Sequence, residues 1–113
     1  KHTLPSRDDY AAFYYPSDFI YPKNARFLKR VVGMPGDTVE ARNHQFFVNG
    51  NPVGKALPVT SDGRPIEEND FKGLIPSGHY YVQGDHPKSL DSRYKVVGLV
   101  SDQMIIGRGY RLF

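Results

Sequence analysis

Prolines and glycines divide this chain into short segments and so limit what it can fold into. The 113 residues include nine prolines and eleven glycines, and the stretches between them are rich in Val, Ile, Tyr and Phe. Short β-branched and aromatic runs bounded by turn residues are typical of antiparallel β proteins, whereas helices need longer periodic runs. The predicted fold class is therefore mainly β, with at most one helical turn near residues 101–103. The length predicts a single domain over residues 1–113.

The strands and turns of this β fold can be placed along the chain. Met34-Pro35-Gly36-Asp37 fits a type II turn, with Gly at the position where φ must be positive. Asn49-Gly50 is a type I′ signal that should fold residues 46–48 back onto Pro52-Val53. Residues 54–78 hold only brief apolar runs and are predicted to form an irregular insertion, either functional or disordered. The predicted strands cover residues 10–13, 26–32, 38–41, 45–48, 79–83, 96–100 and 104–108, with a turn at 42–44.

Composition excludes several classes of function. The chain has no cysteine, and its four histidines show no metal-ligand spacing, so we expect neither a metal site nor a cofactor. Its net charge is +3, but the basic residues are scattered rather than gathered into a patch, so no nucleic-acid partner is predicted. No apolar run approaches the ~20 residues that a bilayer-spanning helix requires.

Lys29 lies in an apolar stretch that ends in the Pro-Gly turn. Residues 27–37 read Phe-Leu-Lys-Arg-Val-Val-Gly-Met-Pro-Gly-Asp. A lysine that a strand carries into an apolar layer loses hydration of its ammonium group, which lowers its pKa. Enzymes use such a lysine as a base near neutral pH. Since side chains alternate along a strand, Arg30 should point to the opposite face from Lys29.

A second polar segment lies between two apolar stretches, at residues 84–94, which read Gly-Asp-His-Pro-Lys-Ser-Leu-Asp-Ser-Arg-Tyr. Asp91 and Arg93 are close enough to pair, and Ser89 can present a hydroxyl. A Ser-His-Asp triad can be drawn from Ser89, His86 and either Asp85 or Asp91, but a triad normally draws its members from separate elements. Taken alone, the segment is also consistent with a surface turn whose ion pair is worth under ~1 kcal/mol.

Together the two segments resemble the signal peptidase I family, the serine-lysine proteases of the bacterial membrane surface. Residues 29–37 match that family's Lys-Arg-Val-Val-Gly-x-Pro-Gly-Asp segment at nearly every position. Residues 84–93 match its Gly-Asp-x-(x)-x-x-Ser-x-Asp-Ser-Arg segment with a loop one residue shorter, and residues 9–13 resemble its Gly-Asp-Ile-Val-Val-Phe strand more weakly. The short loop, with His86-Pro87, is most similar to the TraF-type peptidases of conjugative plasmids. The resemblance implies a signal-peptidase-like antiparallel β fold, partly barrel-like, with residues 54–78 as an irregular insertion.

The resemblance also implies a role for each matching residue. Lys29 would be the general base, and Ser89 would hydrogen-bond its amine and orient it. Asp91 and Arg93 would form an ion pair that holds the second segment against the first, and Gly84 would allow close packing near the lysine. The backbone of Ala25, Arg26, Phe27 and Leu28 would pair with an extended substrate, and Phe27 and Leu28 would help to line pockets for small side chains.

The nucleophilic serine of the family lies upstream of the strand that residues 9–13 resemble, just past a membrane-spanning segment. Ser6 is followed by Arg7-Asp8, and Ser17 lies in a Pro-Ser-Asp turn, so neither has the family's Ser-x-x-Pro-like context. We therefore expect the nucleophile, the oxyanion-hole donors and an N-terminal membrane anchor upstream of Lys1. This fragment is expected to fold without cleaving.

The implied function is that of a serine-lysine endopeptidase anchored in the inner membrane, with its catalytic domain in the periplasm. Its partners would be exported precursor proteins, with conjugative pilin as the expected substrate, and the membrane itself. One alternative is a non-catalytic pilus-assembly or peptide-binding factor with the same fold. A self-cleaving repressor-like protease would share the Ser-Lys chemistry, but the Pro-Gly-Asp and Asp-Ser-Arg segments fit signal peptidases better.

Overall fold

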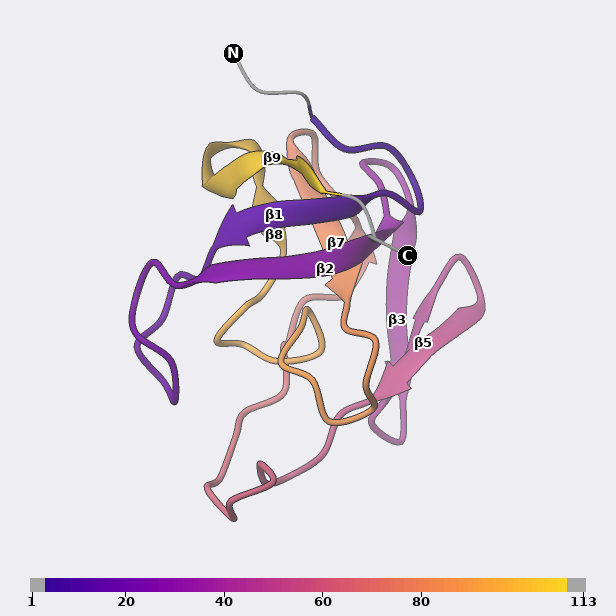
Figure 1. The fold of residues 1–113 in the computed structure, drawn as a ribbon. Helices are drawn as coiled ribbons and strands as arrows, with labels where there is room; N and C mark the ends of the chain where they lie inside the picture. Colours follow the sequence, from indigo (N-terminus) through magenta and orange to yellow (C-terminus); the bar gives the residue numbers. More distant parts are fainter. Residues whose placement is uncertain (1–3, 110–113) are drawn as a thin grey trace.

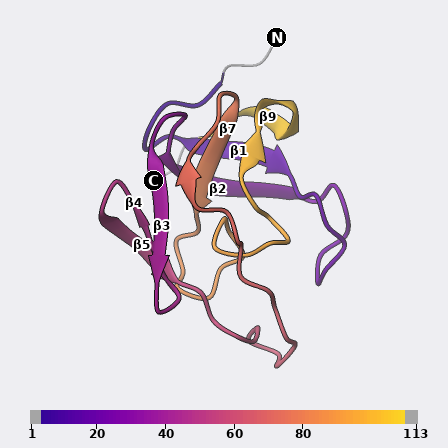
Figure 2. The same cartoon turned by 180° about the vertical axis from the view of Figure 1, so that it is seen from behind.

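The computed structural model describes residues 4–109, which form two antiparallel sheets (Figures 1 and 2). One sheet has the strand order β8-β7-β2-β1-β9 and the other the order β5-β4-β3-β6. The elements are β1 (Tyr10–Tyr14), β2 (Arg26–Gly33), β3 (Thr38–Arg42), β4 (Gln45–Val48), β5 (Asn51–Lys55), β6 (Gly73–Leu74), β7 (His79–Gln83), β8 (Val100–Ser101), the 3₁₀ helix η1 (Asp102–Met104) and β9 (Ile105–Gly109). The mainly β prediction is confirmed. The described strand pairs form two sheets, and closure into a partial barrel stays a prediction.

The hairpin turns form where the sequence predicts them. The Asp37 N–H donates to the Met34 carbonyl at 2.9 Å, and Gly36 has φ 90°, as a type II turn requires. Asn49 and Gly50 have φ 51° and 83° and close a type I′ turn between β4 and β5. The turn between β3 and β4 is tighter than predicted, because Arg42 already pairs with Gln45.

The apolar run at residues 96–100 is not the strand that its composition predicts. Only Val100 belongs to β8, because the chain turns sharply just before it. The Val97 and Gly98 N–H groups both donate to the Tyr94 carbonyl, at 3.1 and 2.9 Å. Val97 is nevertheless buried in the core. Burial, rather than strand pairing, explains the apolar composition of this run.

The predicted insertion at residues 54–78 is irregular but firmly attached to the rest of the domain. Asn69 is buried, its side-chain amide donates to the Ser92 carbonyl at 3.0 Å, and its own N–H donates to the Arg93 carbonyl at 2.8 Å. β6 pairs with β3, and Val59 forms an isolated bridge with Pro65. The insertion was predicted to be either functional or disordered, and these contacts show that it is ordered.

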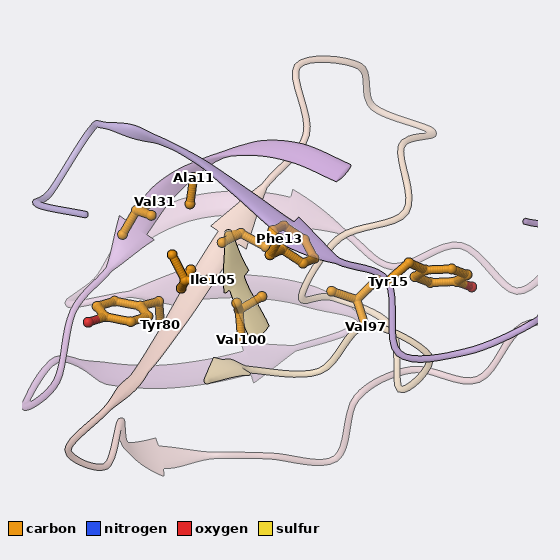
Figure 3. Packing of buried hydrophobic residues seen from close by; sticks show 9 residues of the cluster. Ala11, Phe13, Tyr15, Val31, Tyr80, Val97, Val100 and Ile105 are labelled. Carbon is orange, nitrogen blue, oxygen red and sulfur yellow. The ribbon is translucent and has the colours of Figure 1, made fainter. Parts of the chain in front are cut away.

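Two clusters of buried side chains form the core. The first lies on the inner face of the five-stranded sheet, where Phe13, Val100 and Ile105 gather, with Tyr15 toward one end and Tyr80 toward the other (Figure 3). The second includes Val39, Phe46, Val48, Val53, Ala56, Ile75, Tyr81 and Tyr94. Gly33 of β2 adjoins this second cluster, since a Cβ there would lie 2.7 Å from Ile75 and 2.8 Å from Tyr81.

The phenol of Tyr81 gives the first testable prediction. Among the described residues, its buried hydroxyl has no hydrogen-bond partner. An unsatisfied buried hydroxyl costs about 1–3 kcal/mol, so Tyr81→Phe should raise the free energy of unfolding by about 1 kcal/mol in urea denaturation. Tyr94→Phe is the matched control and should lower it, because the Tyr94 hydroxyl accepts the Leu57 N–H at 3.0 Å. A loss of stability in Tyr81→Phe would show that the Tyr81 hydroxyl does have a hydrogen-bond partner.

Arg7 and Asp37 form an ion pair that ties the N-terminal segment to the Pro-Gly turn. The two Arg7 Nη atoms lie 2.6 and 3.2 Å from the Asp37 carboxylate, which also accepts the Met34 N–H at 2.8 Å. These contacts, the Arg7 hydrogen bond first among them, lower the pKa of Asp37 to about 2. The two residues lie 30 positions apart in the sequence, and the pair was not predicted.

The pair predicts a loss of stability in acid. The folded-state pKa of Asp37 lies below its ordinary value of 3.8, so its contribution is present above that value and is lost as pH falls toward 2. Because Arg7 is half exposed, we expect the contribution to be about 1–2 kcal/mol. Unfolding free energies measured at pH 6 and pH 2.5 should differ less in Asp37→Asn than in the wild type. If the unfolding free energy falls equally in both proteins, the Arg7 and Asp37 pair does not contribute to the loss of stability in acid.

None of the helical structure within residues 4–109 is long and apolar enough to cross a membrane.

Candidate active site

Lys29 lies on β2 with its side chain directed to the inner face of the sheet. Burial along β2 alternates, so Phe27, Lys29 and Val31 share one face, while Arg26, Leu28 and Arg30 share the exposed one. Arg30 therefore points away from Lys29, as predicted. Directly across from Lys29 on β1 is Ala11, which is fully buried and too small to hinder the long lysine side chain.

Gly84 brings the two predicted segments together. A Cβ added to Gly84 would lie 3.3 Å from the Lys29 amine, and only 2.2 Å from the Ser89 Cβ and 2.6 Å from the Ser89 hydroxyl oxygen. Glycine is therefore required for the Lys29 amine and Ser89 to approach the same backbone position. The Ser89 hydroxyl accepts the His86 N–H at 3.2 Å. That Ser89 orients the lysine amine stays a prediction.

Burial dominates the electrostatics of Lys29. Its amine lies over the Phe27 ring, 5.2 Å from the centroid. Desolvation lowers the pKa of Lys29 from its ordinary value of 10.5, the carboxylates of Asp91 and Asp85 partly oppose this, and Arg93 reinforces it. The result is an amine that loses its proton more readily than a lysine on the surface.

Asp91 and Arg93 form a buried ion pair, as the second segment predicts. Their side chains are 1% and 3% exposed, and Arg93 Nε lies 2.8 Å from Asp91 Oδ1. The other Asp91 oxygen accepts the Gly84 N–H at 2.9 Å. The Arg93 guanidinium also donates to the carbonyls of Lys55, Pro87 and Ser89, each at 2.8 Å. The pair therefore fixes both ends of the loop that carries Gly84 and Ser89.

Two further contacts of this loop were not singled out from the sequence. Ser92 is fully buried, and its hydroxyl accepts the Val82 N–H at 2.9 Å, so it replaces a strand partner for β7. The Tyr10 hydroxyl donates to Asp85 at 2.9 Å and joins β1 to the residue after Gly84. Their partners lie in other parts of the chain, which is why local patterns do not indicate them.

A groove of about 450 Å³ runs beside Lys29. β7 pairs with β2 only from Arg30 onward, which leaves the first half of β2 with an open edge. The Val31 N–H donates to the Asp9 carbonyl on the β1 side, so by alternation the backbone groups of Arg26 and Leu28 face the opening. The groove is lined by Ile20, Tyr21, Arg26, Phe27, Leu28, Lys29, Thr60, Ser61, Asp62, Lys88, Ser89 and Leu90.

Of the predicted substrate-binding residues, Arg26, Phe27 and Leu28 line the groove and Ala25 does not. The Ala25 N–H donates to the Pro22 carbonyl at 3.0 Å, and its carbonyl accepts the Tyr15 N–H at 2.7 Å. The prediction that Ala25 offers its backbone to a substrate is therefore corrected, because both groups are already used within the domain.

Neither Ser6 nor Ser17 lines this groove. The Ser6 N–H donates to Asp9, and the Ser17 hydroxyl accepts the Phe19 N–H. The serines that do line it are Ser61 and Ser89. Within the described residues, no three His, Asp or Glu side chains gather in an arrangement that could hold a metal ion.

Comparison with known proteins agrees with this geometry. The family model described as signal peptidase, peptidase S26, matches residues 1–113. Signal peptidase I of Pseudomonas aeruginosa is 31% identical over 96% of this chain and 49% of its own length, and that of Bacillus licheniformis is 33% identical over 80% of this chain and 52% of its own length. The chain thus spans about half the length of these curated relatives.

A solved structure shows the same fold. The crystal structure of a signal peptidase I from Enterococcus faecalis superposes with a TM-score of 0.63 at 28% identity, covering 97% of this chain and all of that one. The family match covers the whole chain, and the solved structure has the same fold. The chain belongs to the signal peptidase I family, peptidase S26.

Proposed function

We propose that the full-length protein is a serine-type endopeptidase that cleaves signal-peptide-bearing precursors at the outer side of the inner membrane. The observation that carries this proposal is the half-buried Lys29, whose amine has a lowered pKa and lies beside an open strand edge. An extended precursor can pair with the backbone of Arg26 and Leu28, which would place its scissile bond near the lysine.

In this proposal Lys29 acts as the general base. Its neutral amine takes the proton of a serine hydroxyl as the serine oxygen attacks the scissile carbonyl, and the protonated amine then donates that proton to the leaving amine. A water molecule releases the acyl group in a second, equivalent step. Ser89 orients the amine, while Asp91 and Arg93 hold the loop in place.

We place the nucleophilic serine in a segment upstream of Lys1, together with the membrane anchor. Ser61 and Ser89 line the groove, but Ser89 is assigned the orienting role and Ser61 lies on an exposed turn. This chain spans about half the length of the relatives, and we propose that such a segment belongs to the remaining length of the protein. Each upstream serine, and Ser61, can be replaced by alanine in the full-length protein to identify the nucleophile.

Conjugative pilin is the precursor that we propose as substrate. The support is the short loop of residues 84–93 with His86-Pro87, which is most similar to TraF-type peptidases. The full-length protein in lipid vesicles should cleave pro-pilin at one bond, which mass spectrometry of the products would locate. Cleavage of other exported precursors but not pro-pilin would reject only the substrate. Binding of precursors without cleavage would favour the alternative of a peptide-binding assembly factor.

A further inference from the structure

The loop between β1 and β2 contributes an aromatic wall to the groove. It extends beyond the ends of both strands (Figure 1, left). Tyr21 of this loop is 48% exposed and lines the groove, and its ring packs edge-on against Phe27 at 5.5 Å between centroids. Phe27 itself lies next to Lys29 on the inner face of β2. Tyr21 therefore occupies space beside Phe27 that a substrate side chain would otherwise fill.

A strained turn fixes the position of Tyr21. The Tyr21 N–H donates to the Phe19 carbonyl at 2.8 Å, which closes a γ-turn whose central residue, Ile20, has φ 69°. A γ-turn of this hand is rare, and a β-branched residue at positive φ is a genuine outlier. Such strain persists only where the surroundings determine the conformation, and it concentrates at functional sites.

Contacts of Tyr15 hold this turn in its strained conformation. Its ring is fully buried and stacks on Phe27, with 4.4 Å between centroids and 6° between planes. Its hydroxyl donates to the Phe19 carbonyl at 2.9 Å, the same carbonyl that closes the γ-turn. Tyr15 also contacts the Tyr21 ring edge-on at 6.2 Å. Tyr15 thus contacts the turn, Tyr21 and Phe27 of the groove together.

We propose that Tyr21 is a specificity-determining residue that limits the size of the substrate side chain pointing onto Phe27, and that the turn at Ile20 is its positioning device. The proposal rests on the proposed function, because it assumes that an extended peptide occupies the groove. Along a strand paired with β2, every second side chain points to the face that Phe27 occupies. One such side chain meets the Phe27 ring and abuts Tyr21.

The test compares peptides that differ at one residue before the cleaved bond, alanine in one and leucine in the other, with each position scanned in turn. In the full-length protein, Tyr21→Ala should raise kcat/KM for the leucine peptide relative to the alanine peptide at one scanned position. We expect a change of about tenfold or more, because a few methylene groups in a pocket provide discrimination of this size. Tyr21→Phe keeps the ring and should keep the wild-type ratio. An unchanged ratio in Tyr21→Ala at every position overturns the proposal.

A matched pair of variants tests the turn. Ile20→Pro forces φ to about −65° and should release Tyr21, so its ratio should shift as in Tyr21→Ala. Ile20→Asn also removes the aliphatic side chain, which lines the groove, but tolerates positive φ, so its ratio should stay closer to the wild-type ratio than that of Ile20→Pro does. Equal ratios in these two variants overturn the positioning role of the turn.

A binding assay separates this proposal from the proposed function. The chain of residues 1–113 is titrated with the same two peptides and followed by NMR through the Phe27 signals, which the wild type and Tyr21→Ala share. The Kd of the leucine peptide divided by the Kd of the alanine peptide should fall in Tyr21→Ala. This result is expected whether or not the full-length protein cleaves. If the wild type cleaves nothing but this ratio falls, only the proposed function fails. If neither peptide binds, or the ratio is unchanged, the specificity proposal fails.

Discussion

Replacing Lys29 by arginine should abolish precursor cleavage by the full-length protein as completely as replacing it by alanine. A guanidinium cannot lose its proton, so arginine preserves the positive charge and much of the length of the side chain but not the base. General base catalysis contributes about 10²–10⁴-fold, and a base that acts as a unit with its nucleophile is worth more than its separate share. We therefore expect kcat/KM to fall at least about 10³-fold in both variants.

The control for Lys29 is Lys95→Arg. Lys95 is half exposed and pairs at the surface with Glu67 and Asp70 at 3.8 and 3.6 Å. No role in catalysis or substrate binding is proposed for it. This variant should retain wild-type kcat/KM. Activity of the wild type should also rise with pH through the lowered pKa of Lys29, because only the neutral amine accepts a proton. Residual cleavage of more than a few per cent in Lys29→Arg would show that another group is the base.

The second large effect is expected on stability. Arg93→Ala leaves the Asp91 carboxylate buried without its countercharge and removes three hydrogen bonds from Arg93 to the Lys55, Pro87 and Ser89 carbonyls. Breaking a buried pair from one side costs about 3–5 kcal/mol, whereas an exposed pair is worth about 0–1 kcal/mol. The free energy of unfolding should therefore fall by about 3–5 kcal/mol in Arg93→Ala.

Lys95→Ala serves as the exposed-pair control and should change the unfolding free energy by less than about 1 kcal/mol. Should Arg93→Ala fail to accumulate as a folded protein, the double variant Asp91→Ala/Arg93→Ala gives a second measurement. It should be more stable than the single variant, since it removes the unpaired charge together with its partner. A loss in Arg93→Ala equal to that in Lys95→Ala would contradict the buried arrangement.

Local chemistry accounts for what the sequence could predict. The Pro35-Gly36 and Asn49-Gly50 turns specify their own geometry, and the strands between them follow from composition and alternation. The alternation along β2 placed Arg30 opposite Lys29, and the short spacing from Asp91 to Arg93 made their pairing predictable. These features depend on residues that are close together in the chain.

Long-range contacts account for what could not be predicted. The Arg7 and Asp37 pair joins residues 30 positions apart, and Asn69 reaches Ser92 across 23 positions. The turn at residues 96–98 is a local exception: the Tyr94 carbonyl accepts two N–H groups there, although the apolar composition is that of a strand. Ala25 was predicted to bind substrate because the family resemblance implied it. Its own hydrogen bonds to Pro22 and Tyr15 depend on how the loop folds back, which the sequence did not reveal.

The pKa of the Lys29 amine tests most directly whether this lysine can act as the base. The chain of residues 1–113 can be labelled at its lysine side chains and titrated by NMR, with the Lys29 signal assigned by its absence in Lys29→Arg. Because desolvation outweighs the carboxylates of Asp91 and Asp85, we predict that Lys29 titrates below its ordinary value of 10.5. A Lys29 pKa at or above 10.5 would mean that the amine is solvated or paired, and would contradict its proposed role as the base.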